Sequence, residues 1–555
     1  MKSKTYPLVE VSNASLTIGA HTILKNLSFQ IGQQEIVSIV GESGSGKSMT
    51  ALSLMGLHPK SATIEAKKFS FESQDLRTLS PKEWQDQRGN TLGMVFQEPQ
   101  SSLNPTLRCG KQLIEVLQLH RKINGKAGSM LIEKVLREVQ LNDAKRIMKA
   151  YPHELSGGQK QRIMIAMALL CKPKLLIADE PTTALDVTVQ REIILLLKSL
   201  QKKYKMSILF ISHDLGLVKQ LADRVLVMYE GSIVESGSSK TLFQNPQHPY
   251  TKGLLFARPE TRVRWERLPT LQDYQKGDFK PKKITSVTRL KRHKSLYSTA
   301  PLLEVKNVEK RFYKKRWLKK NLVFEAVKPL SFSLYSGEVL GLVGESGCGK
   351  STLAKTLVCL EPASAGELFW QGVRLNPKNK AQVSQLRKDV QFIFQDPFAA
   401  LHPFKTIESA LAEVLYVHHD KNHKQNQVRI EALLEQVGLG SEFKSRHPHE
   451  LSGGQRQRVV IARALAVEPK VLICDESVAA LDISVQAQVL NLLNDLKQDL
   501  GLSYLFISHD LAVVKYMSDR VMVMQEGSLV ELQEADALYK NPTNAYTQKL
   551  INAIP

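Results

Sequence analysis

Short runs of apolar residues alternate along the chain with longer stretches in which apolar residues recur at helical spacing. The clearest runs extend from Ile36 to Val40, from Leu175 to Ala178 and from Ser207 to Ile211. Continuous apolar strands separated by helices are typical of a mostly parallel sheet that is covered on both faces. The pattern therefore predicts an α/β fold.

The second half of the chain repeats the first. Three motifs recur in the same order at offsets of 303, 296 and 296 residues, which indicates duplication. We expect one domain at residues 7–257, a second at 301–555, and a basic linker at 258–300. The motif pairs are Gly41-Glu42-Ser43-Gly44-Ser45-Gly46-Lys47-Ser48 and Gly344-Glu345-Ser346-Gly347-Cys348-Gly349-Lys350-Ser351, Leu155-Ser156-Gly157-Gly158-Gln159 and Leu451-Ser452-Gly453-Gly454-Gln455, and Ile211-Ser212-His213-Asp214-Leu215 and Ile507-Ser508-His509-Asp510-Leu511.

The first motif has the spacing GxxxxGK[ST] and follows a predicted strand in both halves, which is the context of a phosphate-binding loop. Its glycines let backbone N–H groups converge on phosphate oxygens, and the next helix adds a favourable dipole. We predict that Lys47 and Lys350 reach the β- and γ-phosphates of ATP. Ser48 and Ser351 are predicted to bind Mg²⁺.

An acidic pair ends an apolar strand in each half: Asp179-Glu180 in the first and Asp475-Glu476 in the second. Such a pair could cap the next helix, but a phosphate loop in the same domain favours catalysis. Asp179 and Asp475 are predicted to bind Mg²⁺, directly or through water. Glu180 and Glu476 are predicted to be the general bases that polarise the attacking water.

The chain carries a net charge of +22, which attracts nucleic acid or an anionic membrane surface. However, 12 Lys and Arg against 4 Asp and Glu lie between Arg258 and Ala300, and 7 more basic residues between Lys310 and Lys320. Neither stretch interleaves aromatic residues as base stacking requires. We interpret the excess as a solvated linker and expect no nucleic-acid partner. No leader and no apolar run of membrane-spanning length is recognisable, which indicates a cytoplasmic chain.

The LSGGQ sequences at 155–159 and 451–455 make the chain resemble the ABC transporter ATPases. The resemblance implies two P-loop NTPase domains of ABC type in tandem, each with a helical subdomain. In that family, Ser156, Gly157, Gly158 and Gln159, or Ser452, Gly453, Gly454 and Gln455, contact ATP held by the opposing domain. Site one would then pair Lys47, Ser48 and Glu180 with Ser452 and Gly454, and site two Lys350, Ser351 and Glu476 with Ser156 and Gly158. ATP would join the halves intramolecularly, and hydrolysis would separate them.

Other positions match the same family. Gln97 and Gln395 resemble the residues that sense Mg²⁺ and report to the membrane partner, and His213 and His509 resemble the switch histidines on the γ-phosphate. Ala184-Leu185-Asp186 and Ala480-Leu481-Asp482 resemble the D-loops. Phe312, or Tyr313, resembles the aromatic residue that stacks on adenine, whereas the first half has Ile18 there.

Several residues depart from the family pattern. Ser477 stands where the first half has Pro181, and Thr183 and Ala479 replace the D-loop serine, which puts equal turnover at the two sites in question. Cys348 lies at a helix N-terminus that favours a thiolate, or is a small neutral filler; the first reading predicts that alkylation blocks site two. A cluster of His418, His419 and His423 has the surroundings of a solvated surface rather than of a metal site.

Two further stretches, at 96–105 with 394–403 and at 245–251 with 541–547, resemble the fused ATP-binding subunits of dipeptide/oligopeptide/nickel-type importers, those for microcin C or glutathione among them. This resemblance implies two integral-membrane permeases, an extracytoplasmic solute-binding protein, and a peripheral location at the cytoplasmic side of the inner membrane. Residues 258–300 contain no Cys, so we expect no iron–sulfur cluster.

Two alternatives stay open. One is a tandem ABC ATPase that acts on ribosomes, although Pro259, Pro269, Gly277 and Pro281 would break the long helical arm of such proteins. The other is an importer ATPase for another solute, such as nickel or a sugar.

Overall fold

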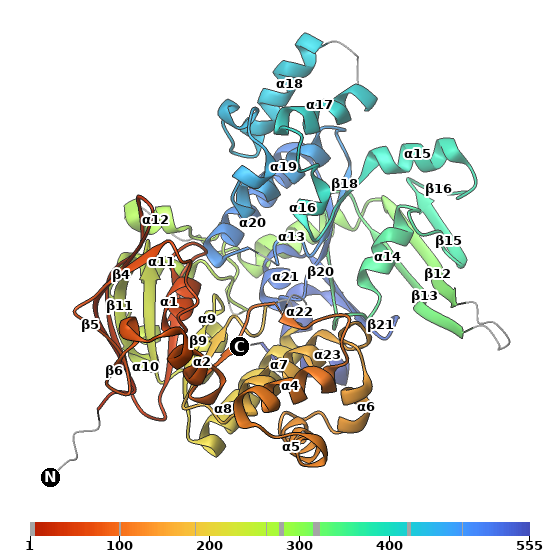
Figure 1. Ribbon diagram of the computed structural model, residues 1–555. Helices are drawn as coiled ribbons and strands as arrows, with labels where there is room; N and C mark the ends of the chain where they lie inside the picture. The colour runs from red at the N-terminus through yellow and green to blue at the C-terminus, as the bar shows by residue number, and fades with distance from the viewer. Residues whose placement is uncertain are drawn as a thin grey trace. The chain divides into compact units, whose positions relative to one another are not determined.

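The computed structural model describes residues 6–98, 102–183, 185–261, 263–276, 282–314, 322–418, 423–479 and 481–554. The chain forms two compact units, Met1–Leu255 and Phe256–Ile554. Each has a mostly parallel six-stranded sheet, a smaller antiparallel sheet and a group of helices (Figure 1). The α/β prediction with two tandem domains is confirmed.

The main sheet of the first unit has the order β11-β10-β3-β9-β8-β7, and only β10 and β11 pair antiparallel. Every residue of β3, β8 and β9 is buried, which explains the unbroken apolar runs. Its strands are β3 (Ile36–Val40), β7 (Leu92–Val95), β8 (Leu175–Asp179), β9 (Ser207–Ile211), β10 (Arg224–Tyr229) and β11 (Ser232–Ser238).

The second sheet of this unit is antiparallel, and its apolar face joins the core cluster that also contains residues of β3 and β8. Its strands are β1 (Val9–Ile18), β2 (His21–Ile31), β4 (Ala62–Glu65), β5 (Lys68–Phe71) and β6 (Gln74–Asp75). The helices of the unit are α1 (Lys47–Leu54), α2 (Pro81–Asn90), α4 (Cys109–Arg121), α5 (Gly125–Glu138), α6 (Ala144–Lys149), α7 (Gly157–Leu169), α8 (Val187–Tyr204), α9 (Leu215–Leu221), α10 (Ser239–Gln244) and α11 (Pro249–Phe256).

The second unit repeats this topology with the sheet order β17-β18-β19-β14-β20-β21 and a smaller sheet of order β13-β12-β15-β16. Its strands are β12 (Leu303–Lys314), β13 (Leu322–Leu334), β14 (Val339–Val343), β15 (Ala365–Trp370), β16 (Val373–Arg374), β17 (Val390–Ile393), β18 (Val471–Asp475), β19 (Ser503–Ile507), β20 (Arg520–Gln525) and β21 (Ser528–Glu534).

The predicted helical subdomains lie between β7 and β8 in the first unit and between β17 and β18 in the second. In the second unit, α17, α18 and α19 stand together, apart from the smaller sheet (Figure 1). The helices of this unit are α12 (Leu271–Lys276), α13 (Ser286–Leu296), α14 (Lys350–Leu357), α15 (Lys380–Asp389), α16 (Pro397–Ala400), α17 (Ile407–His418), α18 (His423–Gln436), α19 (Gly453–Leu465), α20 (Ile483–Leu500), α21 (Leu511–Met517), α22 (Ala535–Lys540) and α23 (Ala545–Asn552).

The segment predicted as a linker lies within the second unit and packs against it. Asn491 forms two hydrogen bonds with the backbone of Leu268, at 2.9 and 2.8 Å. On α13, Arg292 donates to both carboxylate oxygens of Asp519, at 2.8 and 3.0 Å. Arg289 and His293 are each 7% exposed, so the expectation of a wholly solvated segment is wrong. The reason is that these side chains bind groups of the second unit: Arg289 pairs with Glu534 and Asp536, and His293 Nε2 lies 3.1 Å from Oδ1 of the buried Asp519.

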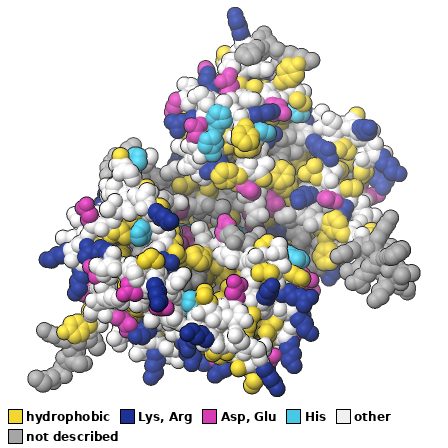
Figure 2. All heavy atoms as spheres, viewed as in Figure 1, with side chains coloured by type: hydrophobic (Ala, Val, Ile, Leu, Met, Phe, Trp, Pro, Cys, Tyr) yellow, Lys and Arg dark blue, Asp and Glu magenta, His cyan; other side chains and the backbone are white. Residues whose placement is uncertain are grey.

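Charge on the surface is mixed. On the face shown in Figure 2, Lys and Arg side chains are scattered among acidic and uncharged ones rather than gathered into one continuous patch. Among the residues that the structure describes, no helix is both long and apolar enough to cross a membrane.

Candidate active sites

The glycine-rich loop that joins β3 to α1 is built around close backbone approaches. A Cβ atom on Gly41 would lie 2.2 Å from the carbonyl oxygen of Met228, and Gly41, Gly44 and Gly46 have φ angles of 154°, 79° and 99°. In the second unit a Cβ atom on Gly344 would lie 2.2 Å from the carbonyl oxygen of Met524. Only glycine fits such positions, so the glycine spacing read from the sequence is a geometric requirement.

The loop wraps the lysine predicted to bind phosphate. Lys47 Nζ donates to the carbonyl oxygens of Gly41 at 2.8 Å and Glu42 at 2.7 Å, and Lys350 Nζ to those of Gly344 at 2.8 Å and Glu345 at 2.9 Å. Ser45 is 4% exposed, and its Oγ has no hydrogen-bond partner among the described residues. A buried ammonium and an unpaired hydroxyl in a loop at a helix N-terminus fit a phosphate ligand.

The predicted Mg²⁺ ligands lie together in both units. Ser48 Oγ donates to Asp179 Oδ1 at 3.2 Å, and Ser351 Oγ donates to Asp475 Oδ1 at 3.1 Å. Burial raises the pKa of Asp179 and of Asp475, and the serine hydrogen bond opposes this only in part. A hydroxyl and a carboxylate oxygen are the hard donors that Mg²⁺ prefers, so the residues fit this ion.

The predicted general base of the first unit lies at the centre of a polar cluster. Glu180 Oε2 accepts hydrogen bonds from Gln97 Nε2 at 2.9 Å and Thr183 Oγ1 at 3.0 Å, and His213 Nδ1 lies 3.2 Å away. Burial opposes ionisation of Glu180, but the His213 hydrogen bond and charge, with Lys47 and Thr183, outweigh it and hold its pKa below the usual value. The carboxylate is therefore ionised, which is the form that a general base requires.

The second unit repeats the cluster with one donor fewer. Glu476 Oε2 accepts from Gln395 Nε2 at 2.7 Å and lies 3.6 Å from His509 Nδ1. The interaction with His509, with the charge of Lys350, lowers the pKa of Glu476 more than burial raises it. Ala479 stands where Thr183 stands in the first unit and supplies no hydroxyl. The two candidate bases therefore differ in their hydrogen bonding.

The backbone of the candidate base is strained in both units. Glu180 and Glu476 have φ angles of 45° and 49°, in the left-handed region that non-glycine residues rarely occupy. Strain of this kind clusters at functional sites, where the surrounding structure holds a side chain in a required orientation.

The signature motifs begin helices α7 and α19. Ser156 and Gln159 cap each other: Gln159 N donates to Ser156 Oγ at 3.3 Å and Ser156 N to Gln159 Oε1 at 3.2 Å, and Ser452 and Gln455 do the same in the second unit. A Cβ atom on Gly158 would lie 2.8 Å from Val189, which explains this glycine by packing. The role of these motifs toward ATP stays a prediction.

The remaining predicted residues are placed as follows. Asp186 caps α8 by accepting from Val189 N at 2.9 Å, and Asp482 stands at the N-cap of α20. Phe312 on β12 is 39% exposed and pairs across the strands with Phe324, and Lys310 Nζ lies 5.0 Å from the centre of its ring. Ala184, Ala480 and His419 lie outside the described residues, and so does the side chain of His423.

The structure decides between the two readings of Cys348. Cys348 is 7% exposed, and burial raises the pKa of its thiol even though Lys350 opposes the shift. A buried thiol of raised pKa stays protonated, so the small neutral filler is the reading that the structure supports.

Two buried tyrosines had no role assigned from the sequence. Tyr250 OH accepts a hydrogen bond from Glu42 N, and Tyr546 OH accepts one from Glu345 N, both at 3.0 Å. The sequence contained one sign of a shared role: the two tyrosines are separated by 296 residues, the same offset as the LSGGQ and histidine motifs.

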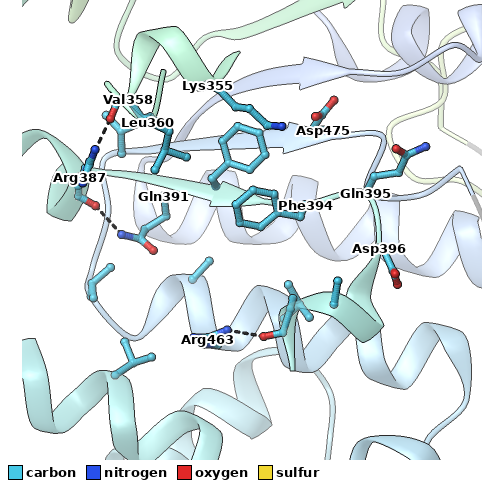
Figure 3. A pocket seen from close by; sticks show the side chains of 18 of the residues that line it. Lys355, Val358, Leu360, Arg387, Gln391, Phe394, Gln395, Asp396, Arg463 and Asp475 are labelled. Atoms are coloured by element: carbon cyan, nitrogen blue, oxygen red, sulfur yellow. Dashed lines mark hydrogen bonds between the residues drawn. The ribbon is translucent and has the colours of Figure 1, made fainter. Parts of the chain in front are cut away.

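A groove of about 860 Å³ opens beside Gln395 in the second unit (Figure 3). Phe392 and Phe394, with ring centroids 4.4 Å apart, form part of its wall, and Arg463 contacts it from α19. Asp475 and Gln395 lie at one end, so the groove is continuous with the candidate site.

Comparison with known proteins gives matches over most of the chain. A family profile described as "ABC transporter" matches residues 24–183 and 327–479, and one described as "Oligopeptide/dipeptide transporter, C-terminal region" matches 234–281 and 530–555. The glutathione import ATP-binding protein GsiA of Escherichia coli O6:H1 is 44% identical over 548 residues, which cover 96% of this chain and 86% of that protein.

The corresponding protein of Escherichia coli O1:K1 is 44% identical over 565 residues, 99% of this chain and 89% of that protein. Among solved structures, the post-hydrolysis dimer of the ATP-binding cassette MJ0796 with ADP and Pi matches 42% of this chain and 98% of its own, with 26% identity and a TM-score of 0.38.

Proposed function

The chain belongs to the ABC transporter family, and from this premise we propose that it hydrolyses ATP to drive the import of peptides or peptide-like solutes through separate membrane permeases. The observation that carries the proposal is the duplicated cluster of a phosphate loop, a serine–aspartate pair and a glutamate bound by a glutamine and a histidine. The C-terminal profile and the glutathione importers at 44% identity support the peptide class of solute.

In each unit, the proposal gives one task to each side chain. Lys47 and Lys350 bind the phosphates, which would replace the loop carbonyls as partners of the ammonium group. Mg²⁺, when bound by the oxygens of Ser48 and Asp179 or of Ser351 and Asp475, neutralises charge on the phosphates.

Glu180 and Glu476 accept the proton of the attacking water. Gln97 and His213 contact the same oxygen of the Glu180 carboxylate, and Gln395 and His509 contact the same oxygen of the Glu476 carboxylate. Fixing a carboxylate in this way means that it needs no reorientation when the proton transfers.

From the family resemblance alone, the proposal includes head-to-tail pairing of the two halves. The signature residues Ser452 and Gly454 would complete the site of Lys47, and Ser156 and Gly158 the site of Lys350. Covalent fusion favours this pairing because each half sees the other at a high effective concentration.

We assign the groove of Figure 3 to a cytoplasmic helix of a permease. Its wall combines the Phe392 and Phe394 rings with the cation of Arg463. An amphipathic helix with one acidic residue would match this apolar and cationic lining. Because Gln395 lies at the end of the groove, a helix there could sense the state of the site. The chain would accordingly lie at the cytoplasmic face of the membrane.

The test traps the closed state. The variant Glu180→Gln/Glu476→Gln is tagged, incubated with Mg-ATP, extracted gently from membranes, and its co-purifying proteins are identified. We expect two multi-span permeases, and a solute-binding protein that recognises them will identify the solute. The matched control, Lys47→Ala/Lys350→Ala, should recover fewer permeases. Ribosomal proteins without a permease would refute the importer assignment and leave the ATPase assignment standing.

A further inference from the structure

The residues matched by the C-terminal family profile contact both phosphate loops. Tyr250 on α11 is 2% exposed and Tyr546 on α23 is 8% exposed. In each case the hydroxyl oxygen accepts a hydrogen bond from the backbone N–H of the second loop residue, Glu42 or Glu345, at 3.0 Å. The same contact therefore occurs twice in one chain.

The local structure shows how the tyrosine is brought to the loop. In the first unit, Glu235 on β11 accepts from the backbone N–H of Gln247 at 2.8 Å and of His248 at 3.0 Å. This carboxylate fixes the turn that precedes α11. The Tyr250 ring then packs on Tyr229 at a centroid distance of 4.4 Å.

The second unit builds the same turn from different residues. Glu531 on β21 accepts from the backbone N–H of Thr543 at 2.8 Å and of Asn544 at 3.2 Å. The strand carboxylate and the tyrosine are common to both units, whereas the residues between them differ. General core packing would need neither the hydroxyl nor its recurrence at one particular amide.

The amide that the tyrosine contacts belongs to the peptide that begins the loop. In the first unit its carbonyl oxygen, on Gly41, accepts from Lys47 Nζ at 2.8 Å, and its N–H, on Glu42, donates to Tyr250. The peptide is thus held from both sides. When Lys47 turns to a phosphate, the hydrogen bond to the tyrosine still fixes the orientation of this peptide.

We propose that Tyr250 and Tyr546 are positioning residues of the ATPase: their hydroxyl groups hold the first peptide of each phosphate loop in the orientation that binds ATP. The inference rests on the proposed ATP hydrolysis. It assigns to the C-terminal segment of each unit a part in nucleotide binding, through Glu42 and Glu345, without contact with the nucleotide itself.

The test uses Tyr250→Phe/Tyr546→Phe in the full chain, with Tyr504→Phe as the matched control. Tyr504 is fully buried in the second unit, and its hydroxyl donates to the carbonyl oxygen of Leu493 at 2.7 Å, so its loss removes a comparable bond. We expect KM for ATP to rise about 3- to 10-fold, with kcat changed less than about twofold, because one hydrogen bond of ordinary strength is lost before chemistry. Tyr504→Phe should lower Tm and leave KM unchanged.

A second measurement is independent of activity. Hydrogen exchange at the backbone N–H of Glu42 and Glu345 should become about 3- to 10-fold faster in the Tyr→Phe double variant and stay unchanged in Tyr504→Phe. Unchanged exchange and unchanged KM in a folded double variant would overturn the inference. A wild-type chain that hydrolyses no ATP would overturn the proposed function, while the exchange experiment would still decide the role of the tyrosines.

Discussion

Replacing Asp519 by Ala should destabilise the packing of α13 against the rest of the second unit. Asp519 is 3% exposed and accepts from Arg292 at 2.8 and 3.0 Å, from His293 at 3.1 Å and from the backbone N–H of Val339 at 3.0 Å. Its loss removes the buried negative charge that interacts with Arg292, Lys497 and Arg264. Removing one partner of a buried ion pair costs about 3–5 kcal/mol.

The first unit supplies a matched control. Asp223 occupies the equivalent position, is exposed, and accepts from the backbone N–H of Ile36 at 2.9 Å. Asp223→Ala removes one hydrogen bond, which is worth about 1 kcal/mol. The two variants thus delete the same side chain from equivalent positions that differ in burial.

Hydrogen exchange measured on peptides of α13 and β14 reports the difference. A cost of 3–5 kcal/mol corresponds to exchange about 10² to 10³ times faster or more, if opening of α13 limits exchange. Equal and small effects of Asp519→Ala and Asp223→Ala would contradict this prediction, because the cations around Asp519 would then not depend on its charge.

Three further outcomes are expected. Thr183→Ala should lower the rate of phosphate release about 3- to 10-fold and Thr183→Ser should restore it, because the hydroxyl orients Glu180; equal rates for Ala and Ser would contradict this. The hydrogen bond from His293 and nearby cations outweigh burial and hold the pKa of Asp519 below its usual value. The contribution of Asp519 to stability is therefore complete above about pH 4 and is lost as the pH falls further. Acid unfolding followed by circular dichroism should be less steep in Asp519→Asn. Phe312→Ala should raise KM for ATP about 5-fold or more, since stacking on a base is worth about 1–3 kcal/mol; an unchanged KM would exclude stacking.

The phosphate loops could be predicted from the sequence because their requirements are local. The spacing of Gly41 and Gly46, a strand before them and a helix after them lie within a few residues, and the carboxyl ends of parallel strands bring Asp179 to the same edge. Because the domain is duplicated, the phosphate loop and the acidic pair could each be predicted from two copies.

Other features depend on contacts that no local pattern encodes. Arg289 and Asp519 are 230 residues apart, so a basic stretch read alone resembles a solvated linker. The sequence left two readings of Cys348 open because its burial depends on how the loop packs on the sheet, not on the helix that follows it. The contact of Tyr250 with Glu42 joins positions 208 residues apart, which is why its motif appeared only as a family marker.

The measurement that tests the central claim most directly is steady-state hydrolysis of Mg-ATP by the full chain and by Glu180→Gln/Glu476→Gln. We expect the wild type to release phosphate and the double variant, still able to bind ATP, to be slower by a factor of about 10²–10⁴, the usual contribution of a general base. A double variant that hydrolyses ATP at the wild-type rate would contradict the assignment of these two carboxylates and the account built on them.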